Sequence, residues 1–172
     1  MSEVVDFRER WVEAIRAHFA LIREVDINRK DDRRIRAGAY HAGLHAEAYE
    51  LSKEPMTTPG AIREAGDLCW YALALARLFG VTVEALVVRL SVHPTTDTRL
   101  GPAAGNLSAA VQRFIRDNRE PDSAHVADWL AIIIDHARDR AGTGLVRILA
   151  ENEVKLRARL ARGTIQGAGG GR

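Results

Sequence analysis

The chain contains little cysteine, few aromatic residues and no convincing strand pattern. Cys69 is the only cysteine, so an intramolecular disulfide and a cysteine-rich zinc site are both excluded. Its position between Leu68 and Trp70, in an apolar run, predicts a buried structural thiol. Alternation of polar and apolar residues, the pattern of a half-buried strand, is missing, whereas Ala, Leu and Arg are abundant. The sequence therefore predicts an all-α fold, a helical bundle.

A strong net charge and long apolar runs are also missing. Basic and acidic residues are interspersed and nearly balanced, giving a net charge of +2, which is weak support for nucleic-acid binding. No nucleic-acid-binding motif is present, so we expect no nucleic-acid partner. No apolar stretch is long enough to span a membrane, and the start MSEVVDFRERW does not resemble a signal peptide. We expect a cytoplasmic protein with no membrane partner.

Apolar periodicity and capping residues indicate a succession of helices. Thr58 and Pro59 are typical of a helix start, whereas Pro55 and Gly80 are typical of helix ends. Residues 93–105 hold two prolines and two glycines and are predicted to form a connection. Predicted helices cover about residues 6–25, 33–53, 59–79, 82–90, 106–118, 123–141 and 143–161.

We expect one domain over residues 1–162, followed by a mobile Gly-rich tail at 163–172. A faint repeat aligns the segment from Gly105 with that from Ala42, and the segment from His125 with that from Glu64, which places Asp128 opposite Asp67. The second half, 103–162, is then a degenerate copy of the helical hairpin in the first half, 1–92. Chance similarity between amphipathic helices explains the alignment equally well.

Two acidic pairs are the most informative feature of the sequence. Glu47 and Glu50, and then Glu64 and Asp67, each have i, i+3 spacing, which places both carboxylates of a pair on one helix face. Thirteen residues separate the pairs, enough for a turn between antiparallel helices. Four converging carboxylates need protonation or a cation, and Mg²⁺ is the natural occupant. Acidic residues on ordinary solvated helix faces are the alternative interpretation.

The residues around these acids resemble the MazG-like, all-α nucleoside triphosphate pyrophosphohydrolase superfamily. Its signature is an ExxE motif, a spacer, and an ExxD motif that leads into an apolar helix. The string REAGDLCWYALALARLFG fits the second motif. The C-terminal segment ENEVKLRARLARGTIQGAGGGR resembles the end of some members, where an Asn-x-x-Lys-Leu helix precedes a Gly-rich tail. Residues 91–147 form an insertion relative to short members, and Tyr49 and His45 stand where small residues are common.

The resemblance implies Mg²⁺-dependent cleavage of a nucleoside triphosphate to the monophosphate and pyrophosphate, with Mn²⁺ as an alternative ion. It implies that the metal ligands are the four acids of the two motifs, Glu47, Glu50, Glu64 and Asp67. Glu50 is our choice for the residue that orients or deprotonates the attacking water.

The same resemblance implies substrate-binding residues on the last helix and the second helix. Lys155 would carry a charge to a phosphate, with Asn152 as a hydrogen-bond donor beside it. Lys53 and Arg159 are further phosphate-binding candidates, although solvated side chains are the ordinary alternative for both.

Three other hypotheses remain open from the sequence. The chain is a homodimer or higher oligomer if the helix pairs leave apolar surface uncovered. A non-catalytic MazG-like scaffold that senses nucleotides or binds a protein is the rival to the enzyme, and a purely structural bundle is a second rival. His41 and His45, at i, i+4, could share a metal, but without a third ligand in the sequence two ordinary histidines are favoured.

Overall fold

The computed structural model describes residues 2–27, 31–92 and 99–164, and over these residues the chain is all-helical. The prediction of an all-α fold is thus confirmed. The helices are α1 (Ser2–Val25), α2 (Arg33–Lys53), α3 (Pro59–Leu78), α4 (Val83–Val92), α5 (Leu100–Asp117), α6 (Ser123–Ala141) and α7 (Leu145–Ala161).

Short polar side chains start three of these helices. Asp32 accepts a hydrogen bond from the Arg34 amide at the start of α2, and Thr58 accepts one from the Ala61 amide at the start of α3. Asp122 caps α6 through the amides of the first turn. These bonds satisfy amides that have no partner within their helix. The predicted bounds of the second, third and sixth helices therefore agree closely with the structure.

One predicted boundary was wrong. Residues 93–105 were expected to form a connection, but α5 begins at Leu100. Pro102 falls in the first turn of α5, where its missing amide hydrogen costs no intrahelical bond. Gly105 is tolerated one turn further on, because a helical glycine weakens a helix by only about 1 kcal/mol relative to alanine. Residues 93–98, and most of the predicted Gly-rich tail, lie outside the described residues.

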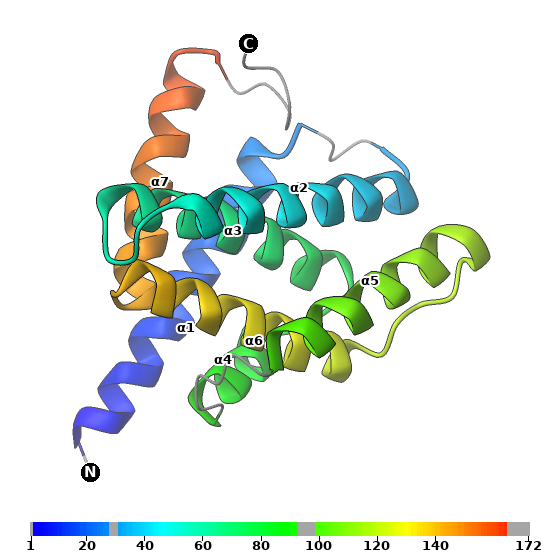
Figure 1. The fold of residues 1–172 in the computed structure, drawn as a ribbon, viewed down its shortest axis with the longest axis horizontal. Helices are drawn as coiled ribbons and strands as arrows, with labels where there is room; N and C mark the ends of the chain where they lie inside the picture. Colours follow the sequence, from blue (N-terminus) through cyan, green and yellow to red (C-terminus); the bar gives the residue numbers. More distant parts are fainter. Residues whose placement is uncertain (1, 28–30, 93–98, 165–172) are drawn as a thin grey trace.

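Two helical hairpins, α2–α3 and α5–α6, form the centre of the molecule (Figure 1). Helix α3 packs against α6, and α2 packs against α5. Helices α1 and α7 cross this arrangement at one end and contact both each other and α3 (Figure 1). This pairing of hairpins has the form expected for a duplicated unit, but duplication stays a prediction, as does the division into halves.

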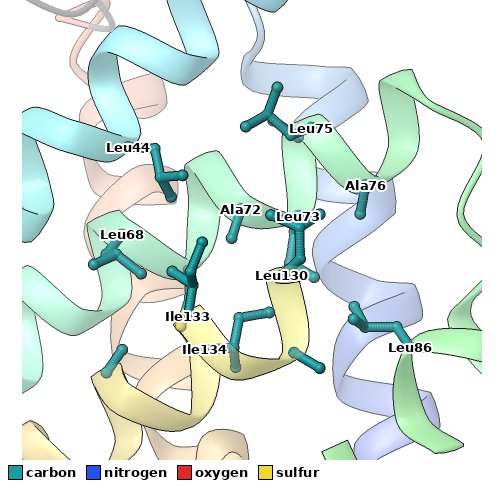
Figure 2. Close-up of a cluster of buried hydrophobic side chains, with 14 of the residues drawn as sticks. Leu44, Leu68, Ala72, Leu73, Leu75, Ala76, Leu86, Leu130, Ile133 and Ile134 are labelled. Carbon is teal, nitrogen blue, oxygen red and sulfur yellow. The ribbon is translucent and has the colours of Figure 1, made fainter. Parts of the chain in front are cut away.

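The hydrophobic core is centred on α3, whose second half is apolar almost all round. Figure 2 shows Leu73 of α3 next to Leu130 of α6, with Ile133 and Ile134 further along α6 in the same cluster. Cys69 is fully buried, as predicted, and burial raises the pKa of its thiol to about 12. Within the part of the chain that the structure describes, no helix is both long and apolar enough to cross a membrane.

Candidate metal centre

The antiparallel packing of α2 and α3 brings together three of the predicted carboxylates. One oxygen from each of Glu47, Glu64 and Asp67 lies within 4.8 Å of the other two. All three side chains are partly buried. Glu64 and Asp67 share a face of α3 because they are three residues apart, and Glu47 reaches them from α2.

Burial and the crowding of these carboxylates raise the pKa of Glu47. Burial and the negative charges of Asp67 and Glu64 raise the pKa of Glu47 to about 7, and the charge of Lys155 opposes this rise only in part. A carboxyl group whose ionised form is disfavoured by its neighbours is stabilised by a proton or by a cation. The cluster therefore has an excess of negative charge that a cation would neutralise.

Helix α7 brings one cationic and one amide side chain to the same cluster. Lys155 donates hydrogen bonds to both carboxylate oxygens of Asp67. Asn152, one turn earlier and 3 % exposed, donates through Nδ2 to Asp67 Oδ1 at 2.8 Å. Both residues were assigned to substrate binding from the resemblance, and both lie beside the predicted metal ligand.

Two glycines permit the close approach of the helices at this site. A Cβ on Gly66 would lie 2.9 Å from Asn152 Cβ, so α7 packs directly on the backbone of α3 beside Asp67. A Cβ on Gly43 would clash with the ring of Tyr71, which occupies that space between α2 and α3. Burial, together with the charges of Glu47 and Asp67, raises the pKa of Tyr71 to about 12.

His18 of α1 is a site residue that sequence reasoning missed. Its Nε2 lies 3.2 Å from Asn152 Oδ1, and its side chain is almost fully buried. An ionised Asp67 only accepts hydrogen bonds, so the Asn152 amide nitrogen faces Asp67 and its oxygen faces His18. His18 therefore donates from Nε2, and burial lowers its pKa to about 4, which keeps the ring neutral. The available signal was a histidine within the apolar stripe of the first helix.

Glu50, the fourth predicted ligand, is not part of the cluster. It lies one turn beyond Glu47, is exposed and receives a hydrogen bond from Lys53 at 3.2 Å. Lys53 also lies over the ring of Tyr49, 3.8 Å from its centroid. These two predicted site residues therefore pair with each other on the surface of α2. Arg159 is exposed on α7, near enough for its charge to act on Tyr71.

The three carboxylates could hold a small divalent cation. Mg²⁺ binds oxygens at about 2.1 Å in an octahedron, which separates its ligand atoms by about 3 to 4 Å. The three carboxylate oxygens, all within 4.8 Å of one another, need only a small inward movement to reach that spacing. Lys155 now neutralises Asp67 from one side, so a cation at this place has to displace or repel the ammonium group.

The acid that the faint repeat places opposite Asp67 is not part of such a cluster among the described residues. Asp128 forms an ion pair with Arg89 of α4, so its charge is neutralised within the fold. Among the described residues, the only group of three or more His, Cys, Asp or Glu side chains that could hold a metal ion is Glu47, Glu64 and Asp67. No protein-family model, curated protein or solved structure with which the chain was compared gave a significant match.

Proposed function

We propose that this protein is a Mg²⁺-dependent nucleoside triphosphate pyrophosphohydrolase of the MazG-like type. The proposal rests on one observation: Glu47, Glu64 and Asp67 lie together in one partly buried site, and Lys155 forms an ion pair with Asp67 there. Carboxylates that share a divalent cation next to a lysine are suited to phosphate chemistry. The ion neutralises phosphate charge and lowers the pKa of water, and the ammonium group adds a point charge for a phosphate.

The three carboxylates, Asn152 and Lys155 would have separate roles at the site. Glu47, Glu64 and Asp67 would hold the ion, with Asp67 held in place by the Asn152 amide. With a cation held there, Lys155 would lose its ion pair with Asp67 and could reach an incoming phosphate. Its long, flexible side chain allows this movement without a shift of α7.

Glu50 stays our candidate for the residue that orients or deprotonates the attacking water. It is exposed one turn from Glu47, and among the described residues it pairs with Lys53, an interaction that is weak at a surface. Bound substrate would free it for a proton-transfer role through one water. Lys53, released at the same moment, would face the phosphates.

A non-catalytic nucleotide-sensing or protein-binding scaffold is the second candidate. The position of Glu50 outside the cluster favours it, because a family member with only three gathered carboxylates has lost one predicted ligand. Such a scaffold would bind nucleotide without turning it over. A homodimer or higher oligomer is part of either proposal.

The test is pyrophosphate release from a panel of nucleoside and deoxynucleoside triphosphates, with Mg²⁺, with Mn²⁺ and with chelator. We expect metal-dependent release that Asp67→Asn abolishes. Asp128→Asn is the matched control, because it removes an acid at the corresponding position of the second hairpin that pairs with Arg89. Nucleotide binding without release by the wild-type protein would replace the enzyme with the scaffold.

A further inference from the structure

A second cluster of ligand atoms lies between α2 and α5, away from the carboxylates. His41 Nε2 is 2.9 Å from Ser108 Oγ, His45 Nε2 is 3.3 Å from the same oxygen, and the two ring nitrogens are 3.1 Å apart. His41 and His45 are one helical turn apart on α2, and Ser108 projects from α5. The sequence showed the histidine pair, but it did not show the third atom.

The three contacts cannot all be hydrogen bonds at the same time. Ser108 donates its hydroxyl hydrogen to the Ala104 carbonyl at 2.8 Å, so toward the histidines its oxygen presents lone pairs. If His41 Nε2 carries a hydrogen, His45 Nε2 and Ser108 Oγ face each other as two acceptors. If His45 carries it, His41 and Ser108 do so. If both rings carry one, both donate to Ser108, but their two N–H groups then face each other. In each arrangement one of the three contacts is unfavourable, whereas all three atoms can direct lone pairs at a shared cation.

The three distances match those of a metal site. A Zn²⁺ ion binds imidazole nitrogens at about 2.0–2.1 Å, which places two tetrahedral ligand atoms about 3.3 Å apart. The observed separations of 2.9, 3.1 and 3.3 Å are close to that spacing. His45 is exposed, so an ion can enter from solvent and retain a water as its fourth ligand.

We propose that His41, His45 and Ser108 form a site for a divalent transition-metal ion of the Zn²⁺ class, which fastens α2 to α5. Imidazole nitrogens select Zn²⁺, Ni²⁺ or Cu²⁺, whereas Mg²⁺ prefers carboxylate oxygens. The site is therefore distinct in position and in ion from the carboxylate cluster, and it does not depend on the proposed hydrolase activity. Burial and the neighbouring His45 lower the pKa of His41, which keeps its ring in the neutral form that binds metals.

The experiment is calorimetric titration of Zn²⁺ into the full chain without an affinity tag, in a Glu64→Gln background that disables the carboxylate cluster. We expect one Zn²⁺ per chain, with affinity lowered at least about tenfold by His45→Gln and lowered less by Ser108→Ala. His125→Gln is the matched control. That histidine is exposed and stacks on Trp129 of α6, so its variant should bind Zn²⁺ as tightly as the background.

A second measurement tests whether Zn²⁺ binding stabilises the folded protein. Zn²⁺ should raise the thermal unfolding temperature of the Glu64→Gln protein, because an ion that binds only the native state stabilises it. The His45→Gln double variant should lose this rise. No Zn²⁺ binding in the background protein, or binding that His45→Gln leaves unchanged, overturns the proposal.

Discussion

Lys155→Met should tighten Mg²⁺ binding in the absence of nucleotide and abolish pyrophosphate release. The two expectations have opposite signs because Lys155 has two different roles in our account. In the unliganded protein its ammonium group neutralises Asp67, a proposed ligand. During turnover the same group would neutralise a phosphate. Methionine retains most of the apolar stem of lysine and removes the charge.

The magnitude follows from Coulomb's law. If the ammonium group withdraws when the ion binds, its attraction to Asp67 is lost. That attraction, about 1 kcal/mol at 4 Å even in bulk water, then opposes Mg²⁺ binding. If it stays about 4 Å from the ion, the repulsion is about 2 kcal/mol in the same medium. The side chains of Lys155 and Asp67 are only 20 % and 22 % exposed, so both values are lower limits. Removal of the charge should therefore strengthen Mg²⁺ binding at least about fivefold.

Calorimetry with Mg²⁺ on the nucleotide-free protein measures this change directly. Lys53→Met is the matched control: it removes a lysine that pairs with Glu50 outside the cluster, so the affinity for Mg²⁺ should change little. If Lys155→Met binds Mg²⁺ no more tightly than the wild-type protein, Lys155 does not compete with a cation at Asp67. The proposed double role of Lys155, at Asp67 and at a phosphate, would then be refuted.

Three further predictions concern stability and packing. Glu47→Gln should raise the unfolding temperature of the metal-free protein, because it relieves the repulsion that raises the pKa of Glu47. It should also remove the stabilisation by Mg²⁺. If Mg²⁺ stabilises the variant as much as the wild-type protein, Glu47 is not a ligand. The pKa of His18 falls from 6.5 in the unfolded chain to about 4 in the fold, so its contribution to stability is complete above about pH 6.5 and is lost as the pH falls toward 4. Between pH 7 and pH 5 the wild-type protein should lose about 2 kcal/mol of unfolding free energy more than His18→Gln does, measured by urea denaturation; equal losses would show that His18 is not held neutral. Gly66→Ala should cost about 1 to 3 kcal/mol, because the new Cβ would lie 2.9 Å from Asn152 Cβ, whereas Gly105→Ala, with open space around its Cβ, should be neutral or slightly stabilising. Equal stability of the two glycine variants would contradict the tight packing of α7 on α3.

Most of the helices could be predicted from local signals in the sequence. Thr58 and Pro59 gave the start of α3, and the apolar run after Asp67 gave the central helix of the core, because capping and periodicity act within a few residues. The connection before α5 was predicted wrongly for a related reason. Proline is also favourable in the first turn of a helix, so Pro102 alone does not distinguish a connection from a helix start.

The site was predictable only in part, because its assembly depends on how the helices meet. Spacing alone put Glu47 and Glu50 on one face, but a residue three positions later is displaced by about 4.5 Å along the helix axis. At the crossing of α2 and α3 only Glu47 is level with Glu64 and Asp67. His18 was missed because its partner Asn152 is 134 residues away in the sequence, and no local pattern encodes that contact.

The central claim is that Glu47, Glu64 and Asp67 together hold a divalent cation, and crystallography with Mn²⁺ tests it most directly. Anomalous scattering locates Mn²⁺ independently of any assumption about ligands, and a non-hydrolysable nucleotide in the same crystal would place the phosphates. Our account predicts a peak in contact with all three carboxylates, with Lys155 moved from Asp67 to a phosphate. A crystal saturated with Mn²⁺ that shows no peak there, and in which Lys155 still pairs with Asp67, would contradict it.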